Sequence, residues 1–228
     1  MDTPGDTWAW VAAVVLLLVV VNLLDSVWWR RGYLVTAPVA AALLLALGRW
    51  AGLSWEDLGL GRGQLPRGLL WGGAAVALVA VGYGIAALVP FAHRTAGPPP
   101  TGATGLGGAL AEITFATVPL EEIAFRGVLW GLVQAERGAV TATVVTSVLF
   151  GVWHVVPSFA DTGVLRPGSL AGMPWGAAAW TIGTVVVTGL AGVLFAELRH
   201  RSGSLLAPIG LHWAVNALGV LFRVAVHR

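Results

Sequence analysis

Seven long apolar stretches run through this chain of 228 residues and decide what it can fold into. Each reaches the roughly 17 residues that a helix needs to cross a bilayer core, where only helices and closed barrels satisfy every backbone polar group. The stretches cover residues 8–24, 33–53, 69–91, 106–133, 139–159, 177–198 and 204–226. The sequence therefore predicts an all-α fold, a polytopic transmembrane bundle of about seven to eight helices around a buried polar cavity.

The composition agrees with a membrane protein and narrows its chemistry. Hydrophobic residues make up 57% of the chain and charged residues 11%, and the mean hydropathy is +0.82, whereas roughly a quarter of a soluble domain is charged. The 13 basic residues are scattered over the connections, so we expect contact with the lipid bilayer and no nucleic-acid partner. The sequence contains no cysteine and no lysine, which leaves Glu, Asp, His, Ser, Thr and Tyr for acid–base or covalent chemistry.

The chain is predicted to have two regions. Residues 1–53 form N-terminal transmembrane helices, and residues 54–226 form the core that carries the candidate site residues. The segment 54–68 mixes Trp and Leu with charges, which is typical of a short interfacial piece. Residues 95–105 and 160–176 are rich in turn formers and predict loops. The first apolar stretch lacks the small-residue cleavage site of a signal peptide, so we expect it to remain as a membrane helix.

Two glutamates and an arginine interrupt the fourth apolar stretch, in the run PLEEIAFRG at residues 119–127. Ionisable groups at membrane depth cost kilocalories each and therefore mark functional sites. Glu122 and Arg126 are four residues apart, so on a helix they face each other and are predicted to form an ion pair. Glu121 has no such neighbour and is left to take a proton from water. The alternative is that the pair only locks two helices together.

Two histidines and an asparagine lie in later apolar stretches. Phe150 and His154 share a helical face by their four-residue spacing, as do His212 and Asn216. Each alone is equally consistent with ordinary hydrogen bonding between membrane helices. Together with Glu121 they favour amide hydrolysis, because Glu with His activates water and His with Asn stabilises an oxyanion. We expect prolines to bend the helices around this cavity, at Pro119, Pro157 and Pro208.

These three runs resemble the signature motifs of the CAAX protease and bacteriocin-processing family, also called CPBP or Abi. The motifs are E-E-x-x-x-R at Glu121, F-x-x-x-H at Phe150 and H-x-x-x-N at His212, and the resemblance covers about residues 54–221. It implies a multi-pass intramembrane endopeptidase of a bacterial-type plasma membrane, acting on a membrane-associated or CAAX-like peptide or protein. By the same resemblance, Glu121 with His154 activates the water, His212 with Asn216 forms the oxyanion site, and Glu122 with Arg126 supports the geometry.

The cofactor and two other functions stay open at this point. Glu121, His154 and His212 could present zinc with two imidazoles and a carboxylate, but the sequence has no H-E-x-x-H, and a metal-free enzyme is favoured. A non-catalytic bacteriocin-immunity or binding protein is the first alternative. The second is a proton-coupled carrier, although the chain lacks the internal duplication typical of transporters. Nothing in the sequence indicates the oligomeric state.

Overall fold

The computed structural model describes residues 4–29, 32–100, 105–161 and 175–227, and within these ranges all regular structure is helical. Six continuous helical stretches are long and apolar enough to cross a membrane, which confirms the predicted fold class. They are Thr7–Trp28, Tyr33–Trp50, Arg62–Ala86, Gly105–Phe159, Gly176–Ser202 and Leu206–Val226.

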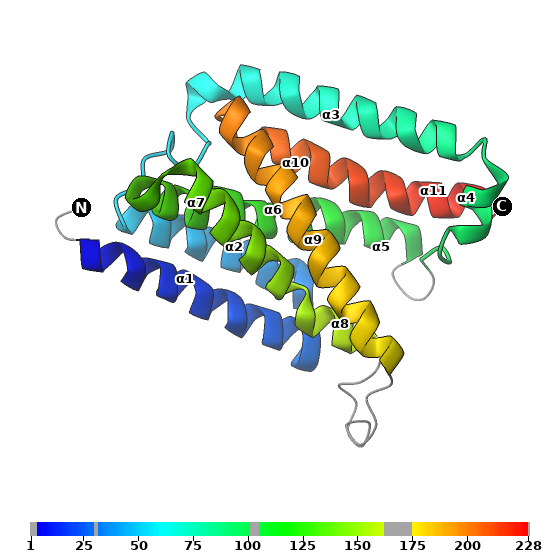
Figure 1. Cartoon of the computed structure of the whole chain (residues 1–228), viewed down its shortest axis with the longest axis horizontal. Helices are drawn as coiled ribbons and strands as arrows, with labels where there is room; N and C mark the ends of the chain where they lie inside the picture. Colours follow the sequence, from blue (N-terminus) through cyan, green and yellow to red (C-terminus); the bar gives the residue numbers. More distant parts are fainter. Residues whose placement is uncertain (1–3, 30–31, 101–104, 162–174, 228) are drawn as a thin grey trace.

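The 55-residue stretch contains both the fourth and the fifth predicted spans. Gly138 interrupts it with φ 81° and ψ 170°, a backbone conformation that favours glycine, and the chain changes direction there. In Figure 1 the chain runs from α5 through α6 and returns along α7 to α8. The elements are α5 (Gly105–Glu112), α6 (Val118–Glu122), α7 (Trp130–Trp153) and α8 (Val155–Asp161), with π-helical turns at Ile113–Thr117 and Ile123–Leu129.

The remaining helices surround this stretch. In Figure 1, α1 lies along one side of the molecule and α3 along the opposite side, with α9 crossing between them. These elements are α1 (Pro4–Leu23), α2 (Tyr33–Trp50), α3 (Leu65–Ala86), α4 (Pro90–Thr95), α9 (Trp175–Ser202), α10 (Leu206–Trp213) and α11 (Gly219–Val226), with π-helical turns at Leu24–Trp28 and Ala214–Leu218.

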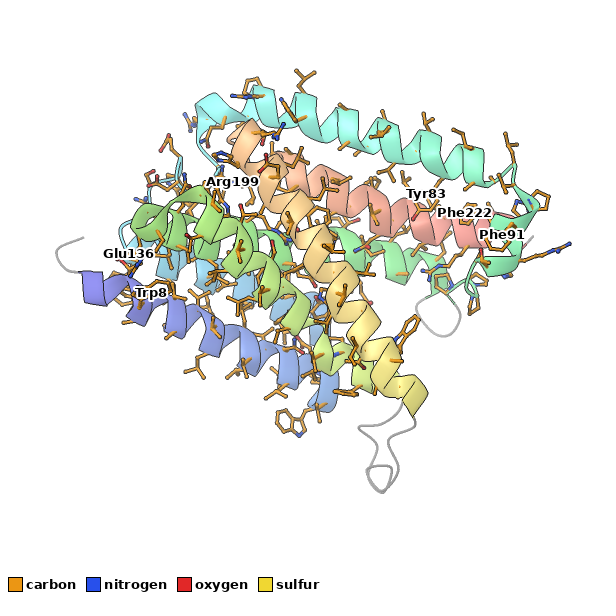
Figure 2. The ribbon with its side chains drawn as sticks, in the orientation of Figure 1. Trp8, Tyr83, Phe91, Glu136, Arg199 and Phe222 are labelled. Carbon is orange, nitrogen blue, oxygen red and sulfur yellow. The ribbon has the colours of Figure 1, made fainter. Side chains whose placement is uncertain are left out.

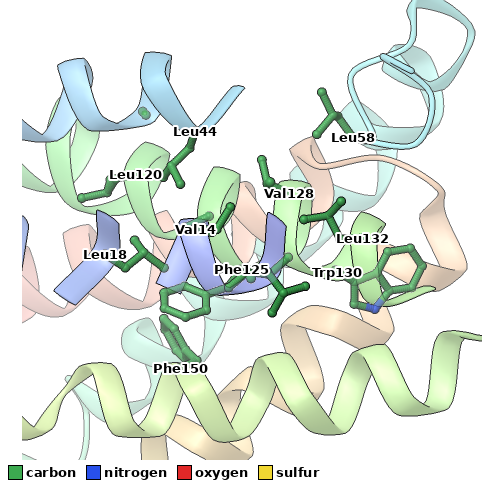
Figure 3. Packing of buried hydrophobic residues seen from close by; sticks show 14 of the residues in the cluster. Val14, Leu18, Leu44, Leu58, Leu120, Phe125, Val128, Trp130, Leu132 and Phe150 are labelled. Carbon is green, nitrogen blue, oxygen red and sulfur yellow. The ribbon is translucent and has the colours of Figure 1, made fainter. Parts of the chain in front are cut away.

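The core lies where α1, α2 and α7 meet the glutamate-bearing segment. Phe125 and Phe150 pack edge to face with ring centroids 5.2 Å apart, and both are almost fully buried. Figure 3 shows Val14 and Leu18 of α1 and Leu44 of α2 around the same cluster. The N-terminal helices therefore pack directly on the segment that holds the glutamates. The division of the chain into two regions at residue 53 stays a prediction.

Segment 54–68 is held against α9 and the start of α10 by hydrogen bonds to its backbone carbonyl groups. The buried Arg199 donates from Nη2 to the carbonyl of Asp57 at 2.8 Å, and the amide of Leu205 donates to the carbonyl of Gly59 at 2.8 Å. Figure 2 labels Arg199 on α9 near this segment. A single turn of 3₁₀-helix, Arg62–Gln64, then leads into α3, which begins at Leu65 rather than at the predicted residue 69.

The prolines act differently from one another. The predicted break at Pro157 is confirmed, because α7 ends at Trp153 and α8 begins at Val155. Pro119 lies in α6, between two π-helical turns. The expected bend at Pro208 is wrong, since Pro208 lies in the first turn of α10, where its missing amide has no helical partner to lose. The helical irregularity near His212 is the π-helical turn Ala214–Leu218 that follows it.

Helices α3 and α10 approach closely because glycines face the contact. A Cβ on Gly72 would lie 2.8 Å from the carbonyl oxygen of Leu206, while a Cβ on its neighbour Gly73 would meet no atom within 4 Å. Small residues at such contacts let membrane helices approach at backbone distance. The α3 surface opposite this contact is therefore free for lipid.

We expect Gly72→Ala to lower the thermal unfolding temperature, because overpacking against backbone costs about 1–3 kcal/mol. For a chain of this size that corresponds to several degrees, at about 2–4 °C per kcal/mol. The matched control is Gly73→Ala, which should leave the temperature unchanged or raise it slightly. Equal effects of the two substitutions would contradict close packing of α3 on α10.

Candidate active site

Glu121 lies in α6, a short helix bounded by π-helical turns, and its side chain is buried, with 4% of the residue exposed. Its Oε1 accepts a hydrogen bond from the indole Nε1 of Trp153 at 3.0 Å. Its Oε2 lies 3.8 Å from Nε2 of His212 and makes no hydrogen bond within the described residues. One oxygen is therefore fixed by the protein while the other is left to receive a proton or a polar ligand.

Behind Glu121, Glu122 is bound to a cation and to an imidazole at once. Its Oε1 lies 3.1 Å from Nη1 of Arg126, which confirms the predicted pair, and 2.7 Å from Nδ1 of His212. Glu122 and Arg126 are fully buried, and the His212 side chain is 7% exposed. Because the carboxylate accepts, His212 donates from Nδ1 and its Nε2 is directed to the Glu121 side of the network.

Aromatic rings complete the surroundings of this network. The Arg126 guanidinium carbon lies 4.0 Å from the ring centroid of Phe150 and 4.9 Å from that of Phe195. Phe195 also stacks on His212, with centroids 4.9 Å apart and an angle of 21° between the planes. Cation–π contacts stabilise a desolvated guanidinium, and they replace hydrogen bonds that Nε and Nη2 of Arg126 do not make within the described residues.

His154 follows the last residue of α7. Its Nδ1 lies 2.8 Å from the carbonyl oxygen of Phe150. A carbonyl only accepts, so Nδ1 carries the hydrogen, and in the neutral form of the imidazole Nε2 is then the acceptor. Its ring also packs edge to face on Phe150, with centroids 4.8 Å apart. Two contacts with one residue thus fix the orientation of the imidazole.

Glu121 and His154 line one cavity of about 320 Å³. That volume holds several water molecules and a substrate side chain, since one water occupies about 30 Å³ of liquid. Two of the carboxylates in its wall come from outside the predicted motifs. The lining residues are Asn22, Asp25, Ser26, Tyr33, Glu112, Thr117, Glu121, Trp153, His154 and Pro157.

Asn216 lies elsewhere. It belongs to the π-helical turn after α10 and lines a second cavity of about 290 Å³, together with Tyr83 and Arg223. Tyr83 closes this region by donating to the carbonyl of Val215 at 3.1 Å and by packing on Phe222, and Figure 2 labels both rings. The structure therefore does not bring Asn216 into the cavity that Glu121 and His154 share.

A divalent metal would need donors from Glu121, His154 and His212. Both imidazoles have Nδ1 in a hydrogen bond and keep Nε2 as a potential ligand, the usual arrangement of metal-binding histidines. In the part of the chain that the structure describes, however, no three His, Asp or Glu side chains form a group that could hold a metal ion. The residues fit a metal in donor type but not in arrangement.

Sequence reasoning assigned no role to several residues that contact the site. Trp153 and Phe195 touch Glu121 and His212, but aromatic residues are too common in membrane helices to stand out. Asn22 and Asp25 carried a usable signal, because polar groups within an apolar span are rare. Both line the Glu121 cavity from the N-terminal region.

Comparison with known protein families identifies one match. The model of the family described as type II CAAX prenyl endopeptidase Rce1-like matches residues 103–218, just over half of the 228 residues. The matched range includes all six candidate site residues from Glu121 to Asn216 and excludes α1, α2 and α3. Neither the curated proteins nor the solved structures yield a match.

We expect Arg126→Met to destabilise the protein by about 3–5 kcal/mol, because removing one partner of a buried ion pair leaves the other charge uncompensated. The matched control is Arg201→Gln, which breaks an exposed pair with Glu197 at the same four-residue spacing and should cost about 0–1 kcal/mol. Denaturant unfolding in detergent measures both. Equal losses would contradict an energetically coupled buried network.

Proposed function

Because the chain belongs to the Rce1-like family of type II CAAX prenyl endopeptidases, we propose that it hydrolyses a peptide bond in a membrane-associated or CAAX-like protein. The observation that supports this best is the shared cavity of Glu121 and His154 among apolar helices. A carboxylate and an imidazole with free acceptor atoms are the groups that activate water for attack on an amide. The substrate would reach Glu121 and His154 as a segment of a protein that is itself associated with the bilayer.

Glu121 is the proposed general base. It takes a proton from a water held between it and Nε2 of His154, and the resulting hydroxide attacks the carbonyl carbon of the substrate. Collapse of the tetrahedral intermediate breaks the C–N bond, and the proton on Glu121 passes to the leaving amine, so that no net proton is gained or lost. The hydrogen bond from Trp153 holds Oε1 of Glu121 and leaves Oε2 for this transfer.

His212, Glu122 and Arg126 act as positioning residues in this proposal. Arg126 orients the Glu122 carboxylate, and Glu122 holds the His212 ring with Nε2 toward Glu121. An oxyanion site made by His212 and Asn216 stays a prediction. It requires Asn216 to turn from its own cavity toward His212 when substrate binds.

Hydrolysis is proposed to proceed without a metal ion. A bound divalent metal would supply Lewis acidity and a more acidic water, and Glu121, His154 and His212 offer the donor types for it but not the arrangement. The proposal for a metal-free reaction depends on the pairing of His212 with Glu122 and on the lack of a three-ligand group among the described residues.

Glu121→Gln and His154→Ala should each reduce kcat by at least about a hundredfold, the usual contribution of a positioned acid or base. Cleavage of a fluorogenic peptide panel by the purified protein in detergent or liposomes measures this. Glu112→Gln, a carboxylate of the same cavity with no assigned step, serves as the control and should retain activity. Full activity in both catalytic variants would refute the proposed chemistry, and substrate binding without cleavage by the wild type would favour a binding protein.

Chelation tests the metal separately. Prolonged treatment with a chelator such as 1,10-phenanthroline should leave kcat of the wild type within about twofold, because Glu121 and His154 need no Lewis acid in this scheme. Loss of activity that zinc restores would instead assign Glu121, His154 and His212 as ligands.

A further inference from the structure

The end of α7 has a carbonyl group that the helix itself cannot satisfy. In an α-helix the carbonyl of Trp153 would accept from the amide of residue 157, four positions later. That residue is Pro157, which has no amide hydrogen. The neighbouring carbonyl of His154 does receive its regular bond, from the amide of Ser158 at 3.1 Å. The bond that Pro157 cannot make therefore lies directly beside the proposed catalytic histidine.

Asn22 of α1 supplies the missing donor. Its side-chain Nδ2 donates to the carbonyl of Trp153 at 2.7 Å, across 131 positions of sequence. Asn22 is 7% exposed, and its own Oδ1 accepts from Ser26 at 3.3 Å. A buried amide that is hydrogen-bonded on both sides is held in one orientation.

The same residue of α7 also contacts Glu121. The backbone of Trp153 is held by Asn22 while its indole donates to Glu121, and His154 is the next residue. A displacement at Trp153 would therefore move the proposed general base and the proposed imidazole together. Asn22 lies outside the range 103–218 that matches the family model.

We propose that Asn22 is a positioning residue for catalysis, which replaces the helical hydrogen bond removed by Pro157 and so fixes Trp153 and His154 at the cavity. This role rests on the proposed function. It assigns the N-terminal helix a part in the active site, beyond crossing the membrane. It also explains how Trp153 and His154 keep fixed positions although α7 is interrupted there.

A double-mutant cycle tests whether the Asn22 side chain replaces the backbone amide that Pro157 lacks as the donor to the Trp153 carbonyl. Asn22→Leu has nearly the same size and removes the donor, so kcat should fall by about ten- to a hundredfold with KM changed by less than about threefold. Pro157→Ala returns a backbone amide at position 157, and Asn22→Leu with Pro157→Ala should recover most of the lost kcat. The effects of the two substitutions should thus be strongly non-additive.

A buried intrahelical bond provides the stability control. Thr146 donates to the carbonyl of Ala142 at 2.8 Å within α7, so Thr146→Val should lower the unfolding temperature about as much as Asn22→Leu while leaving kcat unchanged. Full activity of Asn22→Leu, or a double variant no better than Asn22→Leu, would overturn the role of Asn22 alone. A wild type as inactive as Glu121→Gln would instead overturn the proposed function, and the role of Asn22 with it.

Discussion

The structure depends on keeping an arginine and two glutamates inside a membrane bundle. Arg126 is fully buried, and a lone guanidinium at that depth would cost several kilocalories. Glu122 neutralises it, His212 satisfies the same carboxylate oxygen, and Phe150 covers the guanidinium face. Three separate helical segments must meet to complete this arrangement, so the network fixes their relative positions. Glu121, the proposed general base, precedes Glu122 in the chain and lies 3.8 Å from His212, so its position follows from the packing of this network.

Departures from regular helix place the individual side chains. π-helical turns precede and follow α6, another follows His212, and α7 stops one residue before His154. Such turns are common at functional sites, because they rotate side chains away from the regular 100° spacing. Each irregularity leaves backbone groups that need new partners, as the contact of Asn22 with Trp153 illustrates. The free-energy cost of these lost helical hydrogen bonds is offset by contacts from helices distant in the sequence.

The spans and the Glu122 pair with Arg126 were predictable because they follow from bilayer thickness and from helical spacing. The contact of His212 with Glu122 was not, since it depends on how α10 rotates against α6. For the same reason the sequence placed Asn216 beside His212, whereas the π-helical turn directs it to another cavity. The role of Pro208 was misread because the start of α10 could not be located from an uninterrupted apolar stretch.

The cavity wall combines two parts of the chain with different relations to the family. Glu121 and His154 lie inside the matched range, while Asn22, Asp25 and Tyr33 reach the same space from α1, α2 and the turn between them. Exchange of this N-terminal hairpin between related proteins would therefore alter the shape and acidity of the cavity, and it would leave the proposed position of His154 intact only where the contact of Asn22 with Trp153 is kept. The proposed selectivity and the proposed chemistry are thus linked through one residue of α1.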